Sequence, residues 1–92
     1  MSAMQIRFNP FDMGTPDDKA RKVCEEATEF YAEHHECLEY GTIGVTIGLL
    51  NEIGDVLTAM LNYCNAAGID PQQCIDMAEQ KNRMRGRYGN EH

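Results

Sequence analysis

The sequence contains no tryptophan, only 3 prolines and no pair of cysteines spaced C-x-x-C. Its 4 cysteines therefore give little support to a structural zinc site, whose ligands usually include such a pair. Basic residues are also scarce, with 8 lysines and arginines against 15 aspartates and glutamates. The resulting net charge of -7 argues against general binding of nucleic acid, which requires a basic surface.

Long apolar runs are absent as well. The longest apolar stretch, near residues 43–50, is interrupted by glycines and is too short to span a bilayer. The first 15 residues lack the basic region and apolar run of a secretory signal. These absences predict a reduced, cytoplasmic protein without a membrane segment.

The chain is nevertheless rich enough in apolar residues to fold. Its hydrophobic fraction of 42% is too high for a disordered segment, and 92 residues allow one domain. A single core in so short a chain contributes only a few kcal/mol to stability. We therefore expect a folded subunit that completes its core with a second copy of the chain.

Stretches of helical periodicity predict an all-α fold, a short bundle of about three helices per subunit. Residues 1–15 are typical of an extended N-terminal arm, because Pro10 and Gly14 interrupt any helix there. The helical domain is expected to occupy residues 16–88, with a loose C-terminal tail at 89–92.

Helix ends are marked by capping residues. The first helix is expected to begin with Thr15 as N-cap and Pro16 as first residue, and the third with Asp70 and Pro71 in the same roles. Glycines are expected to end the three helices, at Gly41, Gly68 and Gly86 with Gly89.

The second predicted helix is the most apolar, and we expect it to be buried on more than one side. It runs from about Ile43 or Val45 to Ala67. Glycines within it are costly, by about 1 kcal/mol each relative to alanine. Either they allow close approach between helices, or the helix begins only after Gly48. The glycines concerned are Gly44, Gly48 and Gly54.

Two acidic motifs carry the strongest chemical signal. The first predicted helix contains Glu26 and Glu29, and the second contains Glu52 and Asp55. A spacing of three residues puts both acids of a pair on one helical face, about 5–6 Å apart. On a helical wheel each pair borders the apolar face, whereas Glu25 points to solvent. Antiparallel packing of the two helices would bring acids from both together.

Carboxylates at such close range repel one another when ionised, and a divalent cation relieves that repulsion. Carboxylate oxygens are natural ligands of Mg²⁺, which also binds substrate phosphates. The alternative is a solvated acidic face with ordinary ion pairs, such as one between Lys22 and Glu26. The pair of Glu52 and Asp55 is harder to explain in that way, because it interrupts the most apolar stretch of the chain.

Positive charge gathers near the end of the third predicted helix. Half of the 8 basic residues lie there: Lys81, Arg83, Arg85 and Arg87. Such a cluster is typical of a phosphate site, but also of a solvated helix end that complements the helix dipole.

The order of these motifs resembles a known family. Lys22-x-x-Glu25-Glu26-x-x-Glu29 is followed by Glu52-x-x-Asp55-Val56-Leu57 and then by Lys81-Asn82-x-x-Arg85. This combination is similar to the MazG-like nucleotide pyrophosphohydrolases of the all-α NTP pyrophosphatase superfamily, over about residues 20–87. Each short motif is weak on its own, and their order and helical setting make the combination specific.

The resemblance implies a Mg²⁺-dependent enzyme, with Mn²⁺ as a substitute, that hydrolyses (d)NTPs to (d)NMPs and pyrophosphate. It implies a homodimer or homotetramer and a role in house-cleaning or control of the nucleotide pool. The implied metal ligands are Glu26, Glu29, Glu52 and Asp55. The residues implied to approach the triphosphate are Lys81, Asn82 and Arg85. Glu29 is our candidate for the carboxylate that orients or deprotonates the attacking water.

Two questions stay open in the sequence. Many relatives have a helix with aromatic residues before the first acidic motif, and here the arm with Phe8 and Phe11, or a neighbouring subunit, would have to supply that wall of the base pocket. The alternative function is a non-catalytic helical module that binds a nucleotide or another protein. Release of pyrophosphate in the presence of Mg²⁺ separates the two functions.

Overall fold

The computed structural model describes residues 7–9, 14–39 and 46–86. Within these ranges the regular secondary structure is helical throughout, without a strand, which confirms the predicted all-α class. The helices are α1 (Pro16–Glu39), α2 (Ile47–Ala67) and α3 (Pro71–Met84). No helix in the described part of the chain is long and apolar enough to cross a membrane.

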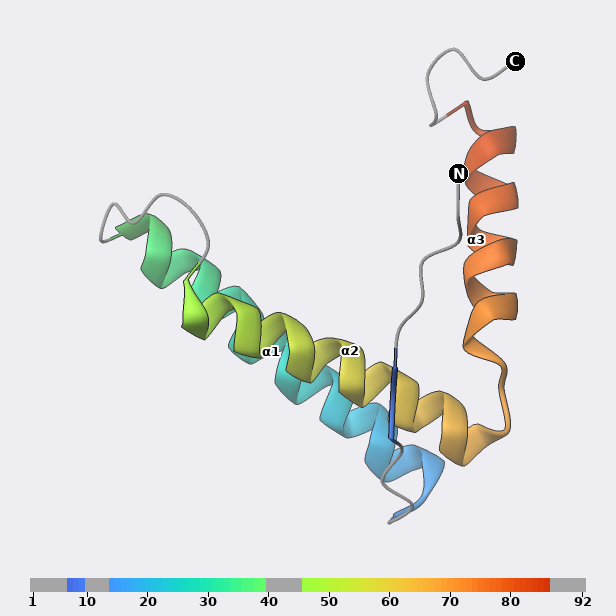
Figure 1. The fold of residues 1–92 in the computed structure, drawn as a ribbon, viewed down its shortest axis with the longest axis horizontal. Helices are drawn as coiled ribbons and strands as arrows, with labels where there is room; N and C mark the ends of the chain where they lie inside the picture. Colours follow the sequence, from blue (N-terminus) through green and yellow to red (C-terminus); the bar gives the residue numbers. More distant parts are fainter. Residues whose placement is uncertain (1–6, 10–13, 40–45, 87–92) are drawn as a thin grey trace.

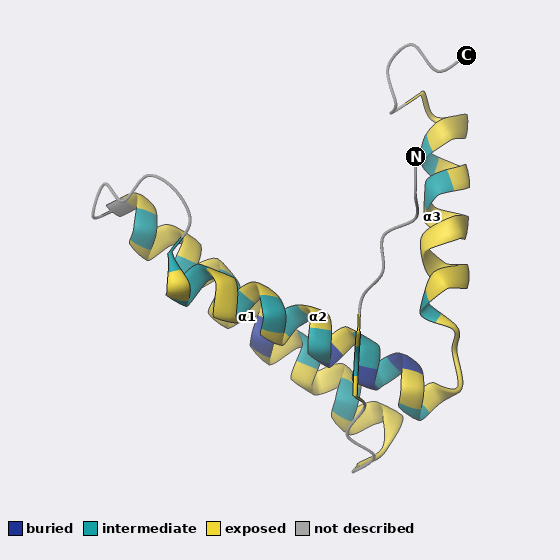
Figure 2. Cartoon of the chain, in the orientation of Figure 1, coloured by how far each residue is buried: buried dark blue, intermediate teal, exposed yellow. Residues whose placement is uncertain are grey.

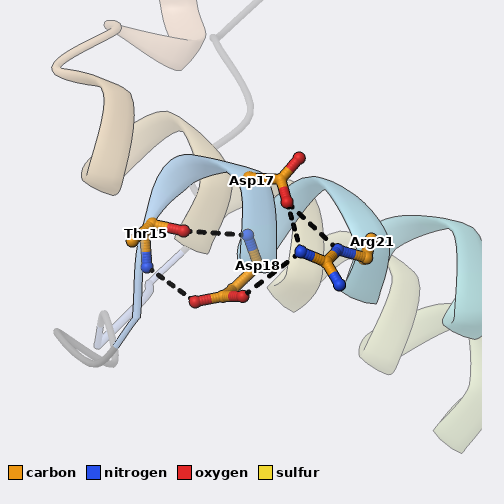
Figure 3. Close-up of polar contacts among 4 residues, drawn as sticks. All are labelled: Thr15, Asp17, Asp18 and Arg21. Atoms are coloured by element: carbon orange, nitrogen blue, oxygen red, sulfur yellow. Dashed lines mark hydrogen bonds and ion pairs between the residues drawn. The ribbon is translucent and has the colours of Figure 1, made fainter.

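The first turn of α1 is fixed by a reciprocal capping interaction (Figure 3). The Thr15 hydroxyl accepts a hydrogen bond from the Asp18 backbone N–H at 3.2 Å, and the Asp18 carboxylate accepts one from the Thr15 N–H at 3.0 Å. Both bonds satisfy N–H groups that the helix itself leaves free. Arg21 pairs with Asp17 and, at 3.8 Å, with Asp18 on the exposed side. The predicted start of the first helix is confirmed.

The start of α2 differs from the prediction. Thr46 has extended backbone angles, and its hydroxyl accepts a hydrogen bond from the Leu49 N–H at 3.1 Å, so the helix begins at Ile47 rather than at Ile43 or Val45. It does not begin after Gly48 either. Thr46 is an ordinary N-cap residue, and this signal in the sequence was missed.

The glycines of α2 have different surroundings. A Cβ at Gly48 would overlap only the carboxylate of Glu33 on α1, the far end of a flexible side chain that can move aside, so close approach of the two helix backbones does not require a glycine there. A Cβ at Gly54 would meet no atom within 4 Å among the described residues, so close approach does not explain Gly54 in the single chain. Gly44 lies outside the described residues.

The helix ends agree with the sequence where they are described. Gly68 caps α2 in the left-handed conformation at φ 70°, and Asp70 caps α3, with its side chain accepting from the Gln72 N–H. Gly86, with φ 68°, follows the end of α3. The predicted helix stop at Gly41, the stop at Gly89, the tail 89–92 and most of the arm lie outside the described residues.

α1 and α2 pack antiparallel along their length, whereas α3 turns away from them after Gly68 (Figure 1). The buried residues of the described chain lie on α1 and α2, and α3 has none (Figure 2). Ala59 and Cys64 are the buried apolar residues of the described chain.

The sequence predicts that α2 is buried on more than one side, and in the single chain its outer face is exposed. Leu50, Ile53, Leu57 and Met60 follow a 3-4-3 spacing along α2 and are between 40% and 56% exposed. We call these four residues the apolar stripe. Phe30 of α1 borders Ile53 and Leu57, but the described residues leave all four members of the stripe at least 40% exposed.

Candidate metal and phosphate site

Three carboxylates converge where α1 and α2 face each other. Glu26 comes from α1, and Glu52 and Asp55 come from α2. One oxygen atom from each lies within 4.8 Å of the other two. The antiparallel packing of α1 and α2, which the sequence left as a condition, brings these groups together.

Glu26 is the most enclosed of the three, with 6% of its surface exposed. Its Oε1 atom pairs with the Lys22 ammonium at 2.8 Å, so the ion pair considered for the sequence is present. Its Oε2 atom is buried and has no hydrogen-bond partner among the described residues. A buried acceptor without a partner is costly, by about 1–3 kcal/mol or more for a charged group.

Glu52 shares this property with Glu26. Its Oε2 atom is also buried without a hydrogen-bond partner in the described chain. Loss of solvent is the main cause that raises the pKa of Glu52 above its ordinary value. Neighbouring carboxylates raise this pKa further, in the order Glu29, Asp55, Glu26 and Glu33.

A single ammonium group does not balance this cluster. Lys22 lies 2.8 Å from Glu26 and 3.6 Å from Glu25, and no cation of the described residues forms an ion pair with Glu52 or Asp55. Two buried oxygen atoms that lack partners, together with a third carboxylate, fit the donor set of a hard divalent cation. The residues therefore fit Mg²⁺ or Mn²⁺.

Glu29 is placed differently from the other predicted metal ligands. It is exposed, and it is not a member of the set of three converging carboxylates. Its charge nevertheless contributes to the raised pKa of Glu52. Glu29 thus lies at the edge of the cluster, while Glu25 is exposed as expected.

The predicted phosphate ligands do not join the cluster within one chain. Lys81, Asn82 and Arg85 lie towards the C-terminal end of α3, the end away from the corner at Gly68 (Figure 1). Lys81 and Arg85 border a shallow depression on α3 itself, formed with Met77, Gln80 and Met84. Tertiary structure, which the order of motifs does not reveal, sets this separation.

A cavity of about 330 Å³ lies beside the carboxylates. Glu26 and Asp55 form part of its wall, and two lysines of α1, Lys19 and Lys22, form another part. Its other lining residues are Asp18, Thr58, Ala59 and Asn62.

Sequence reasoning missed this cavity, although a signal for it exists. Lys19, Lys22 and Glu26 are spaced by three and four residues, and so share a face of α1. Asp55, Thr58 and Asn62 repeat that spacing on α2. Only the packing of the two helices shows that these two faces meet.

Comparison with known proteins gives no match: no family model, curated protein or solved structure is significantly similar to this chain.

Proposed function

We propose that the protein is a Mg²⁺-dependent nucleoside triphosphate pyrophosphohydrolase of the MazG-like kind, which converts a (d)NTP and water to a (d)NMP and pyrophosphate. The observation that carries the proposal is the pair of buried, unpartnered carboxylate oxygens on Glu26 and Glu52, next to Asp55. Carboxylates at such close range repel one another, and a divalent cation relieves that repulsion.

The roles of the residues follow from their positions. Glu26, Glu52 and Asp55 would hold Mg²⁺, which when bound would polarise the phosphate and lower the pKa of a coordinated water. Glu29 is exposed at the edge of the cluster and is not committed to it. Its carboxylate would accept a proton from the attacking water or orient that water towards phosphorus.

Lys81, Asn82 and Arg85 need a second subunit to act in this site. Since α3 turns away from α1 and α2 of its own chain, these residues would approach the carboxylates of a partner copy. There Lys81 and Arg85 would neutralise the charge of the departing pyrophosphate, and Asn82 would donate a hydrogen bond to it.

The surface of α2 supports an oligomer. Its polar side, with Glu52, Asp55 and Asn62, forms the carboxylate cluster and the cavity together with α1, while the apolar stripe is exposed. An apolar depression lined by Phe30, Ile53, Val56 and Leu57 lies on that side. A helix pair with this pattern is completed by a second pair packed on the apolar side, as in a four-helix bundle.

Release of pyrophosphate tests the proposal. Purified protein is incubated with a panel of canonical and modified NTPs and dNTPs, once with Mg²⁺ and once with EDTA. We expect Mg²⁺-dependent release of one pyrophosphate per NMP from at least one member of the panel. No release by folded, oligomeric protein would contradict the proposal.

A second function is favoured by the exposed apolar side chains of α3. Ile75, Met77 and Met84 are all more than half exposed, which suits a helical module that binds another protein. Tight binding of a nucleotide or a protein without turnover would favour this module over the enzyme.

A further inference from the structure

We propose that the cavity beside the carboxylates is a binding site for the polyphosphate chain of the substrate, with Lys19 and Lys22 as its cationic ligands. This inference rests on the proposed function and adds to it two phosphate ligands in the same subunit as the metal ligands. It differs from the resemblance to the family, which pointed to the end of α3.

The first argument is the position of the two ammonium groups. Lys19 and Lys22 border the same cavity as Glu26 and Asp55, so a ligand there contacts the lysines and the metal ligands together. A metal ion on the carboxylates and a phosphate chain on the lysines would be direct neighbours. Mg²⁺ in proteins is commonly held by a few carboxylates and by substrate phosphates at once.

The second argument is the state of the positive charges on α1. Arg21 does not line the cavity. It pairs with Asp17 and, at 3.8 Å, with Asp18 (Figure 3). Lys19 forms no ion pair with a carboxylate of the described residues. Lys22 is paired with the Glu26 carboxylate, which would bind a metal ion instead when one is present. Metal binding would therefore release the Lys22 ammonium into the cavity.

The third argument is the charge of the cavity wall. Without a metal ion its carboxylates outnumber its lysines, because Asp18 is present with Glu26 and Asp55. Phosphate would then be repelled. A divalent cation on Glu26 and Asp55 reverses the balance, so phosphate binding in this cavity requires the metal. Neutral donors complete the wall: the Thr58 hydroxyl and the Asn62 amide.

The size of the cavity suits part of a nucleotide. A volume of about 330 Å³ lies at the lower end of the range for small-molecule sites, about 300–1,000 Å³. The phosphate chain fits inside, and the nucleoside extends towards the open side.

Inorganic tripolyphosphate is a suitable probe, because it carries the phosphate chain of every NTP and no base. Its binding to the full chain is measured by calorimetry with saturating Mg²⁺ and with EDTA. We expect the wild type to bind tripolyphosphate only in the presence of Mg²⁺. The dissociation constants of Lys19→Gln and Lys22→Gln for tripolyphosphate should be about tenfold higher or more. Arg21→Gln, which removes the same charge from the same helix outside the cavity, is the matched control and should bind like the wild type.

Mg²⁺ binding alone separates a phosphate ligand from a purely structural lysine. If the Lys22 ammonium competes with the metal for Glu26, Lys22→Gln should bind Mg²⁺ at least as tightly as the wild type while it binds tripolyphosphate more weakly. Loss of Mg²⁺ affinity in Lys22→Gln would overturn the inference, since Lys22 would then only position Glu26.

Two further outcomes would count against the inference. Unchanged tripolyphosphate binding in both lysine variants would overturn it, as would tripolyphosphate binding in EDTA. Turnover distinguishes this failure from failure of the proposed function. If the wild type releases pyrophosphate from an NTP and both lysine variants keep its KM, the enzyme stands and only the placement of the phosphates is wrong.

Discussion

Asp55 is the exposed member of the carboxylate cluster. Because its side chain makes no ion pair or hydrogen bond within the described chain that would hold the fold together, it is the best single position at which to separate chemistry from folding. Glu26, by contrast, is both a candidate ligand and a buried partner of Lys22.

Asp55→Ala should abolish turnover and leave the helices intact. Removal of one of three metal ligands should lower kcat/KM for pyrophosphate release by about 100-fold or more, since even loss of residues that only support metal ligands costs about 10–100-fold. Helical content, measured by circular dichroism, should remain that of the wild type.

The matched control for this variant is Asp76→Ala. Asp76 is an exposed carboxylate on α3 that accepts a hydrogen bond from Gln72, and it lies outside the cluster and the cavity. Its removal should leave turnover unchanged. Full activity in Asp55→Ala would show that the metal site is assigned to the wrong residues.

At the scale of elements, the capping interaction at the N-terminus of α1 contributes stability that depends on pH. Hydrogen bonds from Thr15, mainly from its backbone N–H, lower the pKa of Asp18 below its ordinary value of 3.8. A carboxyl group with a lowered pKa in the folded state contributes stability that is present above its unfolded pKa. This stability is lost as the pH falls through the lowered folded pKa.

Asp18→Asn should therefore unfold at a lower temperature than the wild type at pH 7, and the gap should narrow as the pH falls below 3.8. Thermal unfolding followed by circular dichroism measures the gap at each pH, and subtraction of the two curves removes the titration of the other acids. A gap that does not change with pH would mean that the Asp18 charge does not stabilise the helix.

Capping chemistry also explains how far the helices could be predicted. The starts of α1 and α3, and the Gly68 stop of α2, follow from single residues whose side chains or backbone freedom act locally. The start of α2 was placed too early because apolar residues precede Thr46 in the sequence. Periodicity alone cannot locate the residue that leaves the helical conformation.

At the scale of the whole molecule, the single chain is open. Its radius of gyration is 15.9 Å, against about 12 Å for a compact chain of this length. With so little apolar surface buried, two antiparallel helices and a separate third helix have few contacts to offset the entropy of ordering them. A second copy packed on the apolar stripe would supply the missing core.

Leu57→Glu should dissociate the proposed oligomer, because it puts a charge in the middle of the apolar stripe. We expect light scattering to show a mass shift towards 10.4 kDa, the mass of one chain, together with loss of helical content and of turnover. Asn65→Glu adds the same charge at an exposed polar position of α2 outside the stripe and should leave the mass unchanged. A wild-type protein that is a folded 10.4 kDa monomer would contradict the proposed assembly.

The sequence by itself determined the all-α class, most helix ends and the acidic spacing, since each depends on residues within one or two turns of one another. Glu26, Glu52 and Asp55 were candidates on that basis alone. Only the tertiary structure decided which of the acids converge and that Glu29 lies at the edge.

Tertiary structure also decided the positions of the positive charges. Packing of α1 on α2 places Lys19 and Lys22 beside the carboxylates, whereas α3, with Lys81 near its end, turns away from them after Gly68. Spacing along one helix defines a face of that helix. Which faces meet depends on how the helices pack, and packing depends on contacts between residues far apart in the chain.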